Sequence, residues 1–192
     1  MRQTRKLEKG ATYHVIGKIN RDETIFEEEE FKSIFLEVVK RAKKKYDFEI
    51  TNFCVMHNHI HFMIKPLGDS SLSRIMQWIL SVFAVIYNKV KDYSGHVWKG
   101  RFFSKIIDSF AYFVNVFRYI CNNPVVLGFV TNACEYRFGG LYHLKNRIYD
   151  IISNYIKTGK MQVKIVVCTI AIRNAMLFLG IRSEIPLARS FL

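Results

Sequence analysis

The segment NFCVMHNHIHFMIKP, residues 52–66, places two histidines one residue apart within an alternating apolar run. Asn58 separates two such runs and suits a tight turn, so the segment predicts a β-hairpin with strands at 48–56 and 59–65. Side chains alternate along a strand, which puts His59 and His61 on one face and apolar residues such as Phe62 on the other. The apolar face can be buried against helices, and two imidazoles remain on the opposite face.

Two imidazoles on one strand face are close enough to bind a single cation. The spacing alone is equally compatible with two structural histidines. A metal site at His59 and His61 would need a third ligand from another part of the chain.

The segments on either side of the hairpin complete a known arrangement. We expect a strand at 13–19, an amphipathic helix at 27–45, a helix that begins after Ser71 and runs to about Lys91, and a strand at 103–107. Asp108 or Ser109 caps a further helix, which we expect Pro124 to end. The order is β-α-β-β-α-β-α, and its first six elements form a split βαβ unit. The predicted fold class is therefore α+β, a ferredoxin-like sandwich of an antiparallel sheet with helices, over residues 1–144.

The composition changes near Leu144. Residues 145–192 contain eight basic and two acidic residues and few turn signals, so we expect a separate basic C-terminal extension of unknown role. The apolar run 163–181 within it is interrupted by Lys164, Arg173 and Asn174. We interpret this run as a buried or partner-facing helix or strand, and not as a membrane span.

The charge balance favours a polyanionic partner. The chain has 29 Lys and Arg against 16 Asp and Glu, a net charge of +13, and binding to phosphates releases condensed counterions. A basic solvated surface without a dedicated partner is the alternative. The four cysteines form no CxxC pair, which argues against a zinc ribbon or a disulfide framework and fits a reducing cytoplasm. No apolar signal core follows the basic N-terminus.

The last predicted helix of the domain carries a polar pair. Tyr119 and Asn123 are four residues apart, so both side chains can point at one place. The phenol could act as a nucleophile and the amide oxygen as a metal ligand. The structural alternative is a tyrosine at the margin of the core and an asparagine near a helix end.

Five stretches, taken in order, resemble the HUH single-tyrosine transposases, and specifically the REP-associated tyrosine transposase branch. They are Tyr13–Ile16, Met56–His61, Ser73–Gln77, Gly95–Phe102 and Arg118–Val125. The resemblance covers residues 10–143. The chain departs from the family pattern at His57, where proline is expected, and at Val126-Leu127, where Arg-Ala is common.

The resemblance implies a nuclease that depends on Mg²⁺ or Mn²⁺ and cuts and rejoins single-stranded DNA through a 5′-phosphotyrosine intermediate. It makes His59, His61 and Asn123 the metal ligands and Tyr119 the nucleophile. The implied partners are single-stranded DNA and DNA hairpins, bound by a monomer or a homodimer. The protein is expected to be cytoplasmic and nucleoid-associated, without a membrane partner.

Basic residues near aromatic ones indicate where DNA is bound. We expect phosphate contacts from Lys99, Arg101, Lys105 and Arg118. Trp98 and Phe102 lie beside them and are either base-stacking or core residues; for Phe102 we favour the core. His14, His96 and His143 are expected to be structural.

Two other functions remain open. A catalytically inactive, domesticated protein that binds DNA hairpins would share the same sheet and basic surface. A small zinc hydrolase would need a carboxylate base near the histidine pair, and Asp69, beyond a proline turn, is the only nearby candidate.

Overall fold

The computed structural model describes residues 8–153, 155–158 and 161–164. Its main sheet has four antiparallel strands in the order β2-β3-β1-β4. The strands are β1 (Thr12–Lys18), β2 (Phe48–Val55), β3 (His59–Pro66) and β4 (Phe103–Ile107). The helices of this part are η1 (Asn20–Asp22), α1 (Glu29–Lys45), α2 (Leu72–Lys91), α3 (Phe110–Val126), η2 (Ala133–Glu135) and α4 (Gly140–Lys145). The predicted α+β fold is confirmed.

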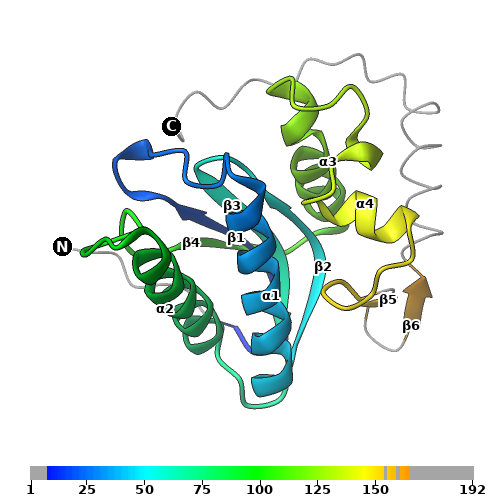
Figure 1. Cartoon of the computed structure of the whole chain (residues 1–192). Helices are drawn as coiled ribbons and strands as arrows, with labels where there is room; N and C mark the ends of the chain where they lie inside the picture. The colour runs from blue at the N-terminus through cyan, green and yellow to red at the C-terminus, as the bar shows by residue number, and fades with distance from the viewer. Residues whose placement is uncertain (1–7, 154, 159–160, 165–192) are drawn as a thin grey trace. The chain divides into compact units, whose positions relative to one another are not determined.

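The sheet lies between two helical layers (Figure 1). Phe62 of β3 packs on Phe35 of α1, with ring centroids 6.1 Å apart, and Phe35 packs in turn on Phe83 of α2 at 5.3 Å. The adjacent residue His61 must point to the opposite face, and there it contacts Tyr119 of α3. The strand alternation predicted from the sequence thus separates an apolar α1/α2 face from a histidine-bearing α3 face.

The ends of the helices follow local capping. The Ser71 side chain accepts a hydrogen bond from the Arg74 backbone N–H at the start of α2, and Ser109 accepts one from Tyr112 at the start of α3. The prediction that Pro124 ends this last helix is wrong, because α3 continues to Val126. A proline near the helix end removes only one backbone donor, and Leu127 N–H still bonds to Asn123 C=O at 3.1 Å. Asn123 therefore stays helical, on the turn after Tyr119.

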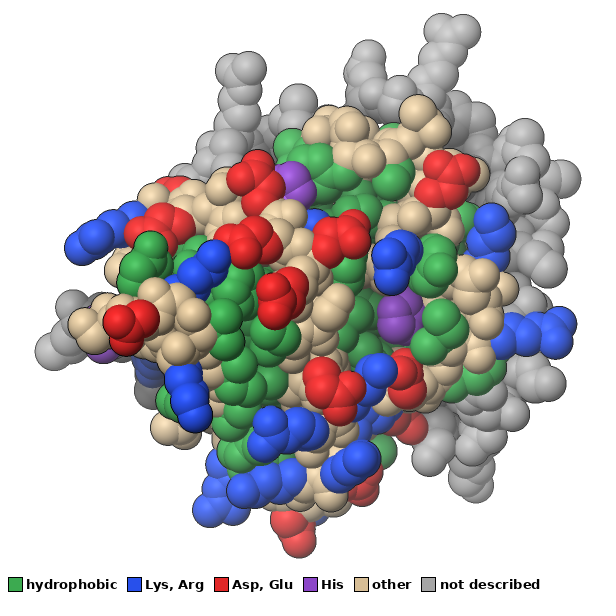
Figure 2. Space-filling view, in the orientation of Figure 1, with side chains coloured by type: hydrophobic (Ala, Val, Ile, Leu, Met, Phe, Trp, Pro, Cys, Tyr) green, Lys and Arg blue, Asp and Glu red, His purple; other side chains and the backbone are tan. Residues whose placement is uncertain are grey.

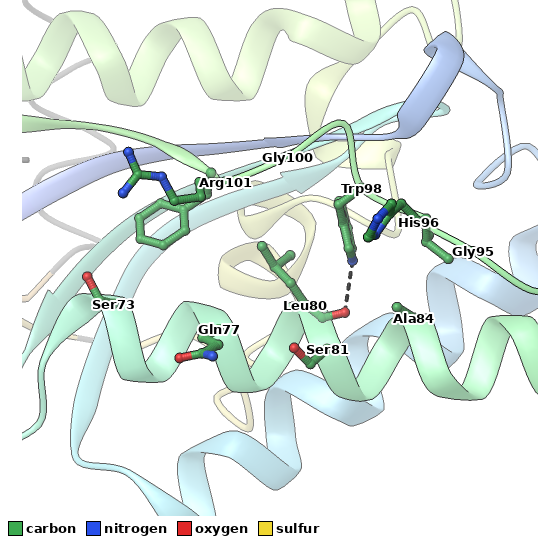
Figure 3. Close-up of a pocket in the computed structure, with 12 residues that line it drawn as sticks. Ser73, Gln77, Leu80, Ser81, Ala84, Gly95, His96, Trp98, Gly100 and Arg101 are labelled. Atoms are coloured by element: carbon green, nitrogen blue, oxygen red, sulfur yellow. Dashed lines mark hydrogen bonds between the residues drawn. The ribbon is translucent and has the colours of Figure 1, made fainter. Parts of the chain in front are cut away.

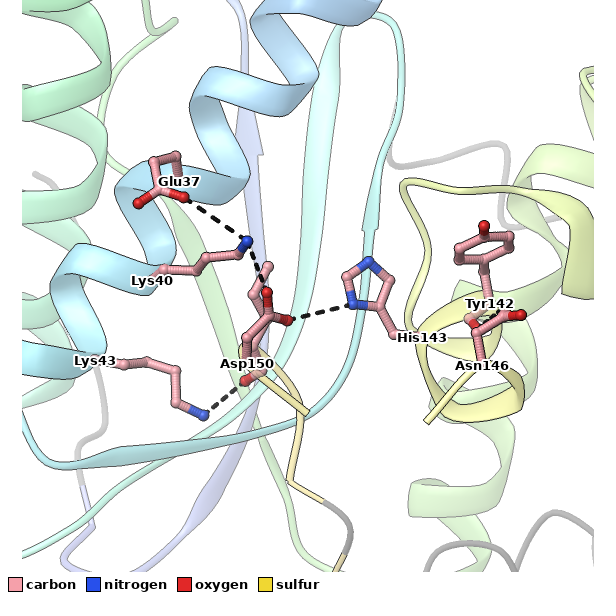
Figure 4. Close-up of polar contacts among 8 residues, drawn as sticks. Glu37, Lys40, Lys43, Tyr142, His143, Asn146 and Asp150 are labelled. Atoms are coloured by element: carbon pink, nitrogen blue, oxygen red, sulfur yellow. Dashed lines mark hydrogen bonds and ion pairs between the residues drawn. The ribbon is translucent and has the colours of Figure 1, made fainter. Parts of the chain in front are cut away.

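Residues after α4 are tied to α1 by polar contacts (Figure 4). Lys40 pairs with Asp150 at 2.6 Å, and Lys43 donates to the backbone C=O of Ile151 at 2.7 Å. The Lys40 hydrogen bond and charge outweigh the opposing effect of burial and hold the pKa of Asp150 below its usual value. The first compact unit ends at Asn154, about ten residues beyond the expected boundary at Leu144.

The second unit begins at Tyr155, and its described part is a two-stranded antiparallel hairpin, β5 (Tyr155–Thr158) and β6 (Met161–Lys164). The prediction for the apolar run 163–181 lies outside the described residues, except for its first two positions. None of the helices in the described part of the chain is long and apolar enough to cross a membrane.

Candidate active site

The register of the sheet gathers histidines from two strands. In the antiparallel pairing of β1 with β3, Ile16 lies opposite His61 and Lys18 opposite His59. Alternation along β1 then puts His14 on the same face as His61. The result is a row of three imidazoles from two neighbouring strands, under α3.

His14 contacts two of the predicted site residues, His61 and Tyr119. Its Nε2 is 3.1 Å from Nδ1 of His61, and the two rings stack with centroids 5.4 Å apart. Its ring also meets Tyr119 edge-on at 6.1 Å. We expected His14 to be structural, and the structure places it inside the site. The sequence did indicate that His14 lies on the same face of β1 as Lys18. The pairing register that brings this face beside His61 cannot be derived from one strand alone.

The three imidazoles are held in the neutral form. Burial and the Lys105 charge lower the pKa of His14 to about 4, and burial and the Lys18 charge do the same for His59. Complete burial, with the neighbouring His59 and His14, puts the pKa of His61 well below its usual range. Neutral imidazole is the form that binds a metal ion.

His59 is oriented by its neighbour in the hairpin turn. Its Nδ1 lies 2.7 Å from Oδ1 of Asn58, so Nδ1 carries the proton and donates it. The lone pair of His59 is then on Nε2. Such a partner fixes the tautomer and the ring orientation of a metal-binding histidine.

Tyr119 is positioned by an anchor between α3 and the sheet. Asn52 of β2 is fully buried; its Nδ2 donates to the Phe117 C=O at 3.2 Å and its Oδ1 accepts from the Phe53 N–H at 2.9 Å. Two residues after Phe117, the Tyr119 ring lies edge-on to His61 with centroids 5.4 Å apart. Its side chain is 48% exposed, so a substrate can reach the phenol. The tyrosine therefore lies beside the histidine pair of its own chain.

The direction of α3 places Asn123 toward the His59 end of the site. Early in the helix, the Tyr112 ring lies under Lys105 of β4, and after its end Phe129 stacks on His57, in the turn before His59, at 3.9 Å. Asn123, one turn beyond Tyr119, thus lies on the hairpin side of it. Its amide nitrogen is buried without a hydrogen-bond partner in the described structure. Exchanging the amide nitrogen and oxygen, which are interchangeable in assignment, would present an acceptor there.

The donor set fits a divalent cation. Nε2 of His61 is buried without a hydrogen-bond partner, and Nε2 of His59 is left for coordination by the bond to Asn58. Among the described residues, no three His, Cys, Asp or Glu side chains are grouped to hold a metal ion. A third protein ligand would therefore be a neutral oxygen such as that of Asn123. Such a set leaves coordination positions open for phosphate and water.

The four predicted DNA-binding cations are divided between two places. Lys105 lies opposite His14 on β4 and so faces the site, and Arg118 precedes Tyr119 on α3. Lys99 and Arg101 lie in the segment between α2 and β4, where Lys99 pairs with Asp22 at 3.4 Å. Lys18, opposite His59 on the same face, is a further cation that the sequence prediction missed.

Another basic cluster lies at the end of α1. Figure 2 shows Lys and Arg side chains gathered at the lower edge of the view, and acidic ones across its middle. Arg41 and Lys45 lie over the Trp78 ring of α2 at 5.9 and 5.6 Å. The positive charge is thus spread over several surfaces of the described chain.

The chain is similar to known proteins in its sequence and in its fold. A model of the family described as "Transposase IS200 like" matches residues 8–123. A solved REP-associated tyrosine transposase bound to a REP hairpin is 20% identical, with a TM-score of 0.66 over 85% of this chain and 98% of that one. That likeness concerns the fold. A crystal structure described as that of a "putative transposase" from Deinococcus radiodurans is 14% identical with a TM-score of 0.40, over 64% of this chain and 97% of that one. No curated protein sequence matches significantly.

Proposed function

The chain belongs to the IS200-like transposase family, and on this premise we propose that it cuts and rejoins single-stranded DNA through Tyr119. The observation that supports the proposal best is the position of the half-exposed Tyr119 ring, 5.4 Å from the buried His61 ring of the same chain. A tyrosine with only a structural role at the margin of the core would not need histidine neighbours. A strand transferase needs a reachable phenol beside a cation site.

In the proposed reaction the phenol oxygen of Tyr119 attacks a phosphodiester. A bond forms between that oxygen and phosphorus, and the bond from phosphorus to the 3′ oxygen breaks. The proton lost by the phenol balances the proton gained by the 3′ oxygen. The products are a 5′-phosphotyrosine link and a free 3′-hydroxyl, and the same hydroxyl or another can reverse the step without ATP.

We assign the cation site to His59, His61 and Asn123, with Mg²⁺ or Mn²⁺ as the ion. A bound divalent ion would polarise the phosphodiester and neutralise a non-bridging oxygen. The chain supplies the rest: Asn58 holds the tautomer of His59, and Asn52 holds α3 against β2 so that Tyr119 stays beside His61.

His14 acts in this proposal as a positioning residue. The hydrogen bond between His14 Nε2 and His61 Nδ1 contains one proton, and it can run in either direction. If His14 donated it, His61 would carry its own proton on Nε2 and could not bind a cation there. The cation site therefore requires His14 to accept, with its own proton on Nδ1.

The positions of the basic residues and the family of the chain both indicate DNA as the substrate. Lys105 faces the site from β4, opposite His14, and Arg118 precedes Tyr119 on α3; in this proposal both hold phosphates beside the scissile bond. Lys99 and Arg101 would contact DNA outside this site. The fold neighbour binds a REP hairpin, and we extend hairpin binding to this chain as part of the proposal.

The test is a search for a covalent protein–DNA product. Purified protein would be mixed with labelled single strands that carry the hairpins flanking its gene, with and without Mn²⁺, and run on a denaturing gel. We expect a metal-dependent band that is absent in Tyr119→Phe and in His59→Ala, and that persists in Tyr112→Phe as the matched control. The proposal fails if no band forms with any flanking strand, or if Tyr119→Phe retains it.

The alternative is a hairpin-binding protein without catalysis. It predicts a gel shift with hairpin DNA that is equal in wild type and Tyr119→Phe, together with no covalent band. The same gels decide between the two functions.

A further inference from the structure

A groove lies on the α2 side of the sheet, away from Tyr119. It has a volume of about 560 Å³ and is lined by α2 and by the segment that leads into β4 (Figure 3). Two of the stretches singled out in the sequence, 73–77 and 95–102, form its two walls. Neither stretch contributes to the histidine–tyrosine site. Its lining is Ser73, Gln77, Leu80, Ser81, Ala84, Gly95, His96, Val97, Trp98, Gly100, Arg101 and Phe102.

The α2 wall presents a polar stripe. Ser73, Gln77 and Ser81 are spaced by four residues, so they follow one face of the helix, and Figure 3 shows them along the side facing the groove. Within the described part of the chain, none of the three side chains has a hydrogen-bond partner. Each is thus available to a ligand.

The opposite wall is a fixed aromatic surface. The Trp98 indole donates to the Leu80 C=O at 2.8 Å and packs against Phe83 with centroids 5.7 Å apart. The Trp98 ring also packs against Phe26 and Phe35, with centroids 6.2 and 6.1 Å apart, and because the residue is only partly buried, part of its side chain borders the groove. Gly95, at the end of this wall, has a φ of +105°, a backbone conformation that favours glycine, and the space around it is open.

The charge of the groove is one-sided. No Asp or Glu lines it. Arg101 is exposed, lies at the Ser73 end of the groove in Figure 3, and has no ion pair within the described residues. A guanidinium without an acidic neighbour favours an anionic ligand such as a phosphate.

We propose that this groove binds unpaired DNA nucleotides, at a site separate from the one that holds the scissile phosphate. The Gln77 amide both donates and accepts and so can pair with a base edge, the Trp98 ring offers a stacking surface, and Arg101 holds a phosphate. The inference rests on the proposed function, because it takes a single strand as the substrate. The groove would bind the DNA strand on the α2 side of the sheet, in addition to the contacts on the α3 side near Tyr119.

Photocrosslinking tests the groove directly. The probe is an oligo-dT of about 15 nucleotides that carries thiothymidine, and full-length Tyr119→Phe protein is used so that no covalent product of the reaction interferes. After irradiation and digestion, crosslinked peptides are identified by mass spectrometry. The variants are Gln77→Ala combined with Arg101→Ala, and Arg74→Ala as a control, since Arg74 is an exposed α2 residue outside the groove.

We expect crosslinks to residues 77–81 or 98–102, whose yield falls about tenfold in the double variant and is unchanged in Arg74→Ala. Crosslinks confined to β3 and α3, or an equal yield in the double variant, would overturn the proposal. The covalent-band assay on otherwise wild-type protein separates the two claims. A covalent band without crosslinks in the groove would contradict the groove proposal alone. Crosslinks in the groove without a covalent band would contradict strand transfer and would leave a DNA-binding protein that uses this groove.

Discussion

Replacing His14 tests the hydrogen bond that sets the His61 tautomer. In His14→Leu, the Nδ1–H of His61 loses its acceptor at 3.1 Å in a fully buried position. An unsatisfied buried donor costs about 1–3 kcal/mol, and loss of such a partner typically lowers metal affinity about 10- to 100-fold. We expect a loss of Mn²⁺ affinity in that range, measured by isothermal titration calorimetry.

His14→Gln supplies the matched comparison, because a glutamine oxygen can accept where Nε2 of histidine did. We expect this variant to keep most of the affinity. His143→Leu is the control for loss of any buried histidine, since His143 contacts Phe53 and Asp150 outside the site. Equal Mn²⁺ affinity in wild type and His14→Leu would refute the tautomer argument, and equal losses in all three variants would reduce it to an effect on folding.

Three further predictions follow from burial around the site. The pKa values of His14 and His59 are lowered from 6.5 to about 4 in the folded chain, so the unfolded chain binds more protons between these values and stability falls as pH drops through this window. The expected loss, in EDTA, is about 2 kcal/mol per imidazole between about pH 7 and about pH 5, and a urea midpoint that does not change over this range would contradict it. Asn52→Ala leaves the Phe117 C=O and the Phe53 N–H without their partner and should lower stability by about 1–3 kcal/mol for each group. It should also slow covalent-band formation, whereas the exposed Asn146→Ala should do neither. Gly140→Ala would bring a Cβ into contact with Asn52 Oδ1 and within 3.0 Å of the Phe53 backbone nitrogen, so thermal unfolding should show a loss of about 1–3 kcal/mol, and an unchanged melting temperature would show that α4 can shift.

The elements were largely predictable because each has a strong local signal. The alternation in β3 and the apolar spacing in α1 and α2 fix the two layers, and Ser71 and Ser109 fix two helix starts. Pro124 misled the prediction, because a local rule for proline does not say how little a helix loses near its end.

The candidate site was less predictable, because it depends on register. Tyr119 and His61 could be named from their spacing and the family resemblance, and the structure brings their rings together. His14 and Lys18 join them only through the pairing of β1 with β3, which is a long-range property of the sheet. The predicted DNA-binding cations likewise fall into two groups because their segments occupy different places on the sheet. Lys105 and Arg118 lie on the elements of the site, and Lys99 and Arg101 lie between α2 and β4.

Mapping the residue that becomes linked to DNA tests whether Tyr119 is the nucleophile. Protein incubated with Mn²⁺ and a flanking single strand would be digested with nuclease and protease, and the peptide that carries a nucleotide would be sequenced by mass spectrometry. We expect a nucleotide linked through its phosphate to Tyr119, and to none of the other nine of the ten tyrosines in the chain. A nucleotide on Tyr112 or another residue would contradict it, and so would a preparation in which no peptide carries one.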